Sequence, residues 1–436
     1  MKPLCVVSCP IDTFSGYGAR SRDFVKALIK IKGKEWDIKL LSQRWGECPW
    51  NFLSQDDPLR KRFIEGIGPN NKPDVWIQIT VPNEFQPMGK FNIGVSAGIE
   101  STIYPAPFIE GNNKMDLNLV SSNHSKNVAI NSNFEKRDNK TQQIISVIKQ
   151  EKPIEVLFEG LDLTKYNKNP QNSGLLKDIK EDFCFLYTGH WLPGGFGEDR
   201  KNTGLMIKTF LETFNTPSKK KPALILKTNM VNYSLMDREE ILKRINEIKS
   251  QVSGNLPNIY LVHGELTDDE MNQLNNDNKV KAFISFTKGE GYGRPLAEAA
   301  ITGKPVITTN WSGHTDFLKP EYNILLGGEL KDVHESAANE FLLKESQWFN
   351  INTEVASRAL KDIFKNYKKY FEQSRKQTQY LKDNWTFDKM CEVLEKLLSK
   401  DLQPTPMTVP LNLPKLNKIQ EKTSNIKLPT LKKIEI

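Results

Sequence analysis

Two glutamates, Glu290 and Glu298, lie on either side of a glycine-rich stretch that could bind an anion. The segment from residue 288 onwards reads KGEGYGRPLAEAAITGKPVITTNWSGHTDF, and a strand is expected just before it at 282–284. Glycines let a ligand approach backbone N–H groups closely, and Pro295 is suited to the first turn of a helix. Because a helix N-terminus carries partial positive charge, this spacing predicts an anion site, with phosphate as the natural ligand.

The two carboxylates indicate that the ligand is more than a phosphate. A carboxylate beside a phosphate is unfavourable unless it binds another group. Paired sugar hydroxyls are the natural partner, because both oxygens of a carboxylate accept hydrogen bonds. A phosphate flanked by sugar hydroxyls describes a nucleotide sugar. The alternative is that both glutamates are solvated side chains on an ordinary loop and helix.

The elements that must position this loop form two successive α/β units. Short apolar runs alternate with helical patterns, which favours parallel sheets covered on both faces. We expect a first domain over residues 1–170, a second over 171–383, and a helix over 384–400. A ligand would bind in the crevice at the carboxyl ends of the strands. The expected strands are 4–8, 38–41, 75–79, 93–96, 117–120 and 156–158 in the first half, and 183–187, 223–226, 259–262, 282–284 and 306–308 in the second.

Several ordered motifs together resemble the retaining glycosyltransferases of the GT-B fold, in the large family 4 group (glycosyltransferase group 1). The glutamate pair within GEGYGRPLAEA, followed by TGKPVITT and WSGHTDFL, is similar to that family's donor site. The stretches SGYGARSRDFVKAL, LFEGLD, FLYTGHW and RKNTGLMIKTF match its other motifs in the same order. The resemblance implies two Rossmann-like domains facing a cleft, with a final helix that crosses back to the first domain and an extended tail.

The resemblance also implies a role for each matching residue. Glu298 would bind the ribose hydroxyls of the donor, Glu290 would contact the transferred sugar, and Lys201 would neutralise the leaving diphosphate. The expected loop at 12–18 would close over the donor. No metal or other cofactor is expected, because the chain lacks a D-x-D motif. The other donor-site residues would be Gly16 and Gly18 in the first-domain loop, and Gly291, Tyr292, Gly293 and Arg294, whose backbone N–H groups would meet the sugar and the diphosphate.

The chain departs from the family pattern at two positions. The family's arginine after the first strand of the second domain is replaced by His190. A second charge for the diphosphate would then come from Arg200, Arg294 or Lys227. The family's first-domain histidine is matched by the stretch VSAGIEST, which offers Glu100 as an active-site residue. His314 precedes a short expected helix near the donor loop, and its role stays open.

Composition limits the compartment and the partners. No run approaches the ~20 apolar residues of a membrane-spanning helix, and the first residues resemble a strand rather than a signal peptide. Five cysteines without zinc spacing indicate reduced thiols and a cytoplasmic protein. The net charge of +8 suits an anionic ligand, an acidic membrane surface or nucleic acid. The acceptor stays open among a glycan, a lipid, a protein and modified DNA.

The last 36 residues differ in kind from the rest of the chain. They carry the unit L-P-x-L-x-K-I twice, at 413–419 and 428–434, among several prolines and lysines. The tail over 401–436 is interpreted either as a disordered arm or as a segment that docks on a partner. A GT-B protein that has lost catalysis and kept a binding or structural role is the competing hypothesis, because a fold does not fix a function.

Overall fold

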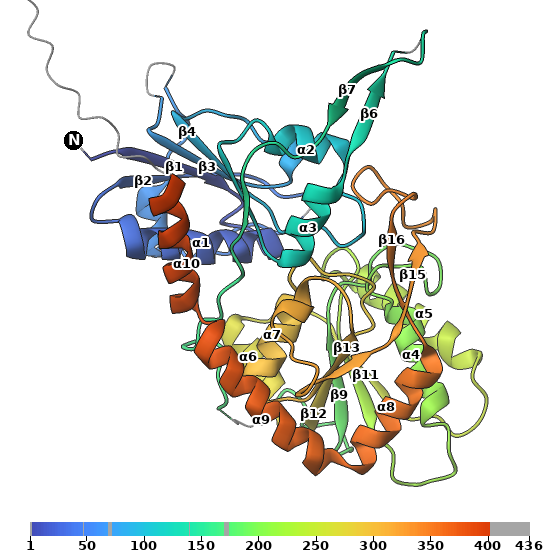
Figure 1. Ribbon diagram of the computed structural model, residues 1–436. Coiled ribbons are helices and arrows are strands. Elements are labelled where there is room, and N and C mark those ends of the chain that lie inside the picture. Colours follow the sequence, from blue (N-terminus) through green and yellow to red (C-terminus); the bar gives the residue numbers. More distant parts are fainter. Residues whose placement is uncertain (1, 47, 69–71, 139, 170–173, 402–436) are drawn as a thin grey trace, which may run out of the picture. The chain divides into compact units, whose positions relative to one another are not determined.

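The computed structural model describes residues 2–46, 48–68, 72–138, 140–169 and 174–401 (Figure 1). The first sheet has six parallel strands in the order β2-β1-β3-β4-β5-β8. These strands form where short apolar runs are buried on both faces, as the runs of the sequence predict. Their bounds are β1 (Leu4–Cys9), β2 (Asp37–Ser42), β3 (Val75–Ile79), β4 (Phe91–Val95), β5 (Leu117–Val120) and β8 (Ile154–Val156).

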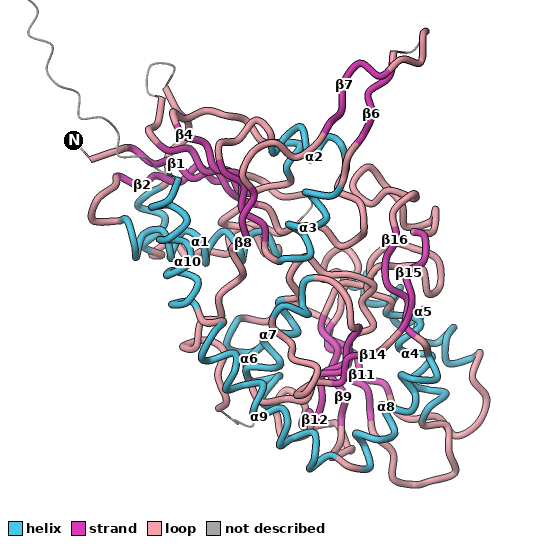
Figure 2. Tube along the Cα trace, viewed as in Figure 1, coloured by secondary structure: helices cyan, strands magenta, loops and turns pink. Residues whose placement is uncertain are grey.

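The helices of the first half connect these strands. The principal ones are α1 (Gly16–Lys32), α2 (Ala106–Asn112) and α3 (Asn123–Asn131). Two short 3-10 helices, η1 (Pro58–Arg62) and η2 (Pro82–Glu84), lie in the longer connections. Figure 2 shows helices on either side of the sheet, the arrangement of a doubly wound domain.

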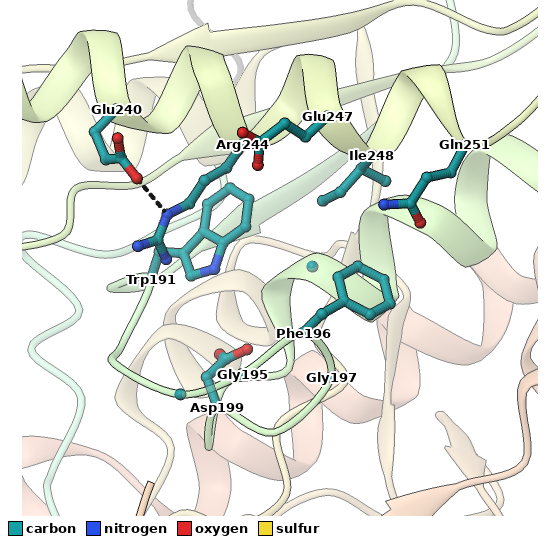
Figure 3. A pocket seen from close by; sticks show the side chains of 12 residues that line it. Trp191, Gly195, Phe196, Gly197, Asp199, Glu240, Arg244, Glu247, Ile248 and Gln251 are labelled. Atoms are coloured by element: carbon teal, nitrogen blue, oxygen red, sulfur yellow. Dashed lines mark hydrogen bonds and ion pairs between the residues drawn. The ribbon is translucent and has the colours of Figure 1, made fainter. Parts of the chain in front are cut away.

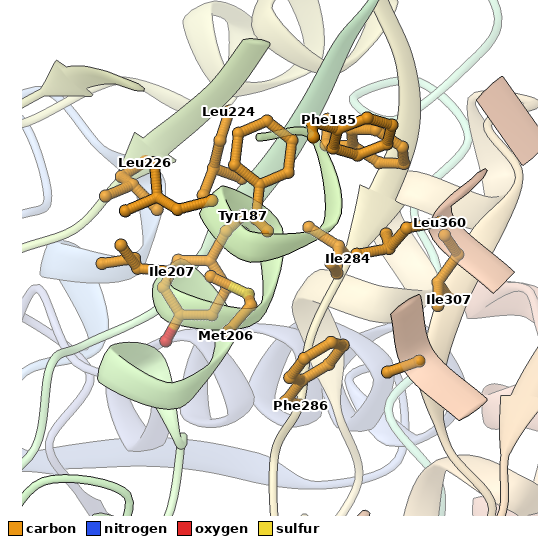
Figure 4. Close-up of a cluster of buried hydrophobic side chains, with 14 of the residues drawn as sticks. Phe185, Tyr187, Met206, Ile207, Leu224, Leu226, Ile284, Phe286, Ile307 and Leu360 are labelled. Carbon is orange, nitrogen blue, oxygen red and sulfur yellow. The ribbon is translucent and has the colours of Figure 1, made fainter. Parts of the chain in front are cut away.

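The second sheet repeats this topology, with six parallel strands in the order β11-β10-β9-β12-β13-β14. Helices α4, α5 and α8 share one large apolar core with the sheet, part of which is shown in Figure 4. Helices α6, α7 and α9 pack on one another as a separate group. The bounds are β9 (Cys184–Thr188), α4 (Thr203–Thr213), β10 (Ala223–Lys227), α5 (Leu235–Ser250), β11 (Ile259–Val262), α6 (Asp268–Asn276), β12 (Val280–Ile284), α7 (Arg294–Ile301), β13 (Val306–Thr309), η3 (Gly313–Asp316), β14 (Ile324–Leu326), α8 (Thr353–Lys365) and α9 (Tyr367–Asn384).

The last described helix, α10 (Phe387–Asp401), returns to the first domain and packs along α1. The Lys30 ammonium of α1 donates to Asp388 of α10 at 2.5 Å. The chain just before α10 pairs with Leu161 at the end of the first domain. The Leu161 amide donates to the Trp385 carbonyl, and the Leu161 carbonyl accepts from the Phe387 amide. The predicted fold class, two doubly wound domains with a returning helix, is confirmed by these strands and contacts.

Two antiparallel hairpins were not predicted. They are β6 (Phe134–Arg137) with β7 (Ile144–Ile148), and β15 (Gly328–Asp332) with β16 (Gln347–Ile351). The β6–β7 hairpin leaves Ile144 and Ile145 exposed, and it projects away from the first sheet in Figure 1. These strands lack the buried apolar run that is typical of a central strand. The apolar pattern of the sequence therefore does not predict them.

The expected loop at 12–18 is shorter than predicted. Helix α1 begins at Gly16, so Gly16 and Gly18 lie in its first turn and the loop ends at Ser15. The cause is Ser15, whose hydroxyl accepts from the Gly18 amide at 2.9 Å and so caps the helix. A Cβ on Gly18 would come within 2.3 Å of the Thr13 carbonyl oxygen, so this glycine permits close packing of the chain.

The described helices contain no apolar segment of the length needed to cross a membrane. The two L-P-x-L-x-K-I units and the rest of 402–436 lie outside the described residues.

Candidate active site

The loop between β12 and α7 carries the predicted anion site and lies directly against the first domain. A Cβ on Gly289 would come within 1.9 Å of the Glu100 carbonyl oxygen, and one on Gly291 within 2.1 Å of the Ala97 carbonyl oxygen. Gly293 has a φ of 99°, a left-handed conformation that favours glycine. The three glycines therefore shape the loop and allow the second domain to approach segment 97–100 of the first.

Four successive amides of this loop have no hydrogen-bond acceptor among the described residues. They belong to Gly291, Tyr292, Gly293 and Arg294, and the first three of these residues are buried. The loop itself is well held, since the Glu290 amide donates to the Ser312 hydroxyl and its carbonyl accepts from the Gly313 amide, both at 2.9 Å. Buried amides rarely lack a partner, so this run at the N-terminus of α7, three of whose four residues are buried, indicates a place for an anion.

Glu290 is the centre of a buried ionic cluster that joins the two domains. Its side chain receives Lys201 Nζ at 2.5 Å and an Arg200 guanidinium nitrogen at 3.3 Å. Arg200 also lies 3.5 Å from the carboxylate of Glu100, which follows β4 in the first domain. The basic pair comes directly before α4, and so both domains contribute to the cluster.

The charges of this cluster control its protonation. Burial alone would raise the pKa of Glu290, but Lys201 and Arg200 outweigh it and lower that pKa to about 2. Burial lowers the pKa of Lys201, although Glu290 opposes the shift. The two carboxylates of Glu290 and Glu100 face the two cations of Lys201 and Arg200. An arriving diphosphate would therefore compete with the carboxylates for Lys201 and Arg200.

Glu298, in the second turn of α7, belongs to a separate network organised by Arg294. The Arg294 guanidinium lies 2.9 Å from Glu298, 2.7 Å from Asp23 and 3.4 Å from Glu159. Asp23 is in α1 and Glu159 follows β8, so Arg294 links α7 to the first domain. Burial raises the pKa of Glu298 to about 7, in spite of the opposing effect of Arg294.

The structure thus separates the predicted residues into groups. Glu100, Arg200, Lys201 and Glu290 come together, whereas Arg294 and Glu298 form the second network. Desolvation and the charges of Lys201, Lys227 and Arg200 lower the pKa of His190. That histidine therefore lies within electrostatic range of these basic residues.

Three other residues singled out by the sequence are held by neighbours. Lys227 donates to the Gly264 carbonyl at 2.8 Å, and burial lowers its pKa to about 8. The Tyr292 ring packs against Phe317, with ring centroids 4.9 Å apart. His314 is fully buried and donates from Nε2 to the Thr309 carbonyl at 2.7 Å.

The sequence alone did not reveal the partners of Arg294 or the support of the loop. Asp23, Glu159 and Ser312 were not among the predicted site residues. All three stand inside motifs that resemble the family, SGYGARSRDFVKAL, LFEGLD and WSGHTDFL. The signal was therefore present, but nothing in the spacing shows that Asp23 and Glu159 meet a residue more than 130 positions away.

A separate cavity of about 320 Å³ lies within the second domain, between α5 and residues 191–204 (Figure 3). Arg244 of α5 lies over the Trp191 ring and pairs with Glu240 at 3.0 Å. Asp199 and Phe196 line the side formed by the loop, as Figure 3 shows. Arg200 and Lys201 follow directly in the chain, so this loop borders both the cavity and the ionic cluster.

No group of three or more His, Cys, Asp or Glu side chains in the described part of the chain is arranged to hold a metal ion.

Comparisons with known proteins agree on the fold. No protein-family model matches the chain, and no curated protein sequence matches it. Sucrose-phosphate synthase from Thermosynechococcus elongatus is similar in structure, with a TM-score of 0.59 and 9% identity over 92% of this chain and 99% of that one. Anabaena HepE, in complex with UDP and glucose, is similar with a TM-score of 0.57 and 10% identity, over 91% of this chain and 100% of that one.

A similar fold also occurs in a protein that is named as a phosphatase. The N-terminal domain of Candida albicans trehalose-6-phosphate phosphatase gives a TM-score of 0.54 and 12% identity, over 92% of this chain and 100% of that one. Sequence identities this low show a shared fold and do not show a shared activity. The chain has the GT-B fold, in which two Rossmann-like domains each contain a sheet of six parallel strands.

Proposed function

We propose that this protein is a glycosyltransferase that moves a sugar from a nucleotide-sugar donor, UDP- or GDP-linked, to an acceptor hydroxyl. One observation supports the proposal above all: buried Glu290 meets Lys201 and Arg200 beside four amides that have no acceptor among the described residues. Cations and amides suit a diphosphate, and a carboxylate suits sugar hydroxyls. The similarity to sucrose-phosphate synthase and to HepE with bound UDP and glucose supports the same reading.

The proposed mechanism assigns charge stabilisation to the chain's own residues. As the bond between sugar and diphosphate breaks, negative charge grows on the leaving phosphate. Lys201, Arg200 and the amides from Gly291 to Arg294 would offset that charge. Loss of one such stabiliser typically costs roughly 10²–10³ in rate. Glu290 would accept from hydroxyls of the transferred sugar, and Glu298 would accept from the ribose.

We further propose retention of configuration, with the acceptor hydroxyl attacking from the face that the diphosphate leaves, and no requirement for a metal. Support for both comes from the resemblance of GEGYGRPLAEA and its companion motifs to retaining enzymes. We place the activity in the cytoplasm, because the five cysteines are all unpaired and four of them are buried.

The test is incubation of the pure protein with a panel of UDP- and GDP-sugars, with and without EDTA, followed by detection of free nucleoside diphosphate. Transfer or hydrolysis with at least one donor is expected, and it should fall at least 100-fold in Lys201→Ala. Lys219→Ala is the matched control, because Lys219 is an exposed lysine of the same domain. The anomeric configuration of the product, read by NMR, tests retention.

A second candidate is a nucleotide-sugar-binding protein without turnover. The observation in its favour is that both key carboxylates already have partners, Glu290 with Lys201 and Glu298 with Arg294. Binding of nucleotide sugars with no release of nucleoside diphosphate from any donor would favour this candidate. Absence of both binding and release would contradict both candidates.

A further inference from the structure

A cavity of about 290 Å³ lies next to the ionic cluster, between the first domain and the loops of the second. This volume is at the lower end of the range for pockets that hold small ligands. Its walls are mainly apolar: Val81, Ile99 and Phe108 come from the first domain, and Leu192, Phe341 and Leu342 from the second. The chemistry of these walls favours an apolar group of about the size of one ring.

The wall from the second domain is firmly built. Phe341 lies in the connection between β15 and β16, and its ring centroid is 5.4 Å from that of Phe108. It joins the first-domain core cluster that contains Ile99 and Phe108. At the base of the same connection, Gln347 and Thr102 exchange hydrogen bonds of 2.8 and 2.9 Å across the domains. Ordered contacts between the domains therefore hold this wall of the cavity in place.

The charged groups of the cavity sit where it meets the proposed reaction centre. Glu100 and Arg200 both line it, 3.5 Å apart, and Arg200 continues to Glu290 at 3.3 Å. A molecule in the cavity would therefore have its apolar part against Phe108, Phe341 and Leu342 and a polar group beside Glu100. A carboxylate there accepts from a hydroxyl and repels an anion.

We propose that this cavity binds the acceptor, and that the acceptor's reacting hydroxyl belongs to a small molecule or terminal unit with a ring-sized apolar group. The proposal rests on the function proposed above. A polyanion such as DNA does not suit the site, because the apolar walls cannot pair with phosphates and Glu100 would repel them. A fully hydroxylated sugar would leave its hydroxyls without partners on most sides.

Two acceptors that differ only in the apolar group test the proposal. Phenyl β-glucoside and methyl β-glucoside are each offered to the full-length protein with UDP-glucose, UDP-N-acetylglucosamine and GDP-mannose. Binding is measured by saturation-transfer NMR, and transfer by kcat/KM. The phenyl compound should bind and should react about tenfold or more better than the methyl compound, since burial of a ring favours it. Equal behaviour of the two compounds would overturn the proposal.

Substitutions in the cavity wall locate the effect. Leu342→Trp should fill the cavity and remove the preference for the phenyl compound. Leu342→Asn, which keeps the number and branching of the side-chain heavy atoms and adds polarity, should do the same if the larger substitution does not fold. Leu330→Trp is the matched control, because Leu330 is an exposed leucine on β15 of the same hairpin. A phenyl preference that survives in both Leu342 variants would also overturn the proposal.

Separate readouts distinguish failure of this inference from failure of the proposed function. If no nucleotide sugar binds or is cleaved, the proposed function fails, and the acceptor role of the cavity fails with it even when phenyl β-glucoside binds. If a donor is cleaved but only duplex DNA or another large polymer accepts the sugar, and the phenyl compound does not bind, this inference alone fails.

Discussion

Substitution of Glu290 by glutamine should separate nucleotide binding from sugar transfer. In the wild-type protein the Glu290 carboxylate neutralises Lys201 at 2.5 Å and Arg200 at 3.3 Å. Glutamine keeps the shape and removes the charge, so Lys201 loses its carboxylate partner and Arg200 keeps only Glu100, and both cations can bind a diphosphate more strongly. At the same time the acceptor for the hydroxyls of the transferred sugar is weakened. UDP or GDP should therefore bind more tightly, while transfer should fall.

The magnitude follows from the charges. A pKa lowered from the usual 4.5 to about 2 corresponds to about 3 kcal/mol in favour of the ionised, folded form. Glu290→Gln should lose stability of this order, since one partner of a buried pair is removed. Removal of a competing charge near the phosphate should improve the affinity for the nucleoside diphosphate by about tenfold, because about 1.4 kcal/mol of Coulomb energy is enough.

The assay combines chemical unfolding with calorimetric titration. The stability contributed by Glu290 is present above its unfolded pKa of about 4.5 and is lost as the pH falls through the folded value of about 2. The stability gap between wild type and variant should therefore be largest at neutral pH and should narrow below about pH 4.5. At neutral pH, added UDP or GDP should raise the free energy of unfolding of the variant more than that of the wild type. The stability gap between the two proteins should therefore narrow.

Glu329→Gln is the control, because Glu329 pairs with Lys331 at 3.0 Å on an exposed strand. Exposed pairs contribute about 0–1 kcal/mol, so stability and nucleotide affinity should stay near the wild-type values. A Glu290→Gln variant that binds UDP and GDP more weakly than the wild type would refute the reasoning. So would a variant with full stability at neutral pH.

Four further substitutions probe the loops and the second carboxylate. Gly16→Ala should keep or slightly raise the unfolding midpoint, since nothing lies within 4 Å of the added Cβ. Gly18→Ala should lower the midpoint, because its Cβ would lie 2.3 Å from the Thr13 carbonyl oxygen. Equal midpoints for the two variants would contradict the helical placement of both glycines. Gly291→Ala would place a Cβ 2.1 Å from the Ala97 carbonyl oxygen, and should lower both the unfolding midpoint and nucleotide binding in a melting and titration series. Because burial raises the folded pKa of Glu298 to about 7, this group costs stability as the pH rises from about 4.5 to 7, so Glu298→Gln should gain on the wild type across that window in urea unfolding.

Much of the fold could be predicted because parallel strands buried on both faces need nearly continuous apolar runs. The runs at 4–8, 75–79 and 223–226 each mark an observed strand. The hairpins β6–β7 and β15–β16 could not be predicted in this way. All five residues of β15 are exposed, so the strand shows no alternation of apolar and polar residues that would predict it. The start of α1 was misplaced because two glycines outweighed the capping Ser15 in the prediction.

The sequence predicts where the site residues lie along the chain, but not which side chains they contact. Spacing placed Glu290 in the loop and Glu298 in the helix that follows, and both lie where expected. That Glu290 meets Lys201 and that Arg294 meets Asp23 depends on how distant segments fold together. The separations are 89 and 271 residues, far beyond the reach of local periodicity. The contact of Gly291 with Ala97 is of the same kind.

The most direct test of the central claim compares nucleoside diphosphates with monophosphates. The claim is that Lys201, Arg200 and the amides of the α7 loop hold a diphosphate. Calorimetric titration of the wild type and of Lys201→Ala with UDP, UMP, GDP and GMP measures this contribution. The wild type should bind one diphosphate well above its monophosphate, and Lys201→Ala should lose most of that difference. Equal binding of diphosphate and monophosphate by the wild type, or a difference that survives in Lys201→Ala, would contradict the claim.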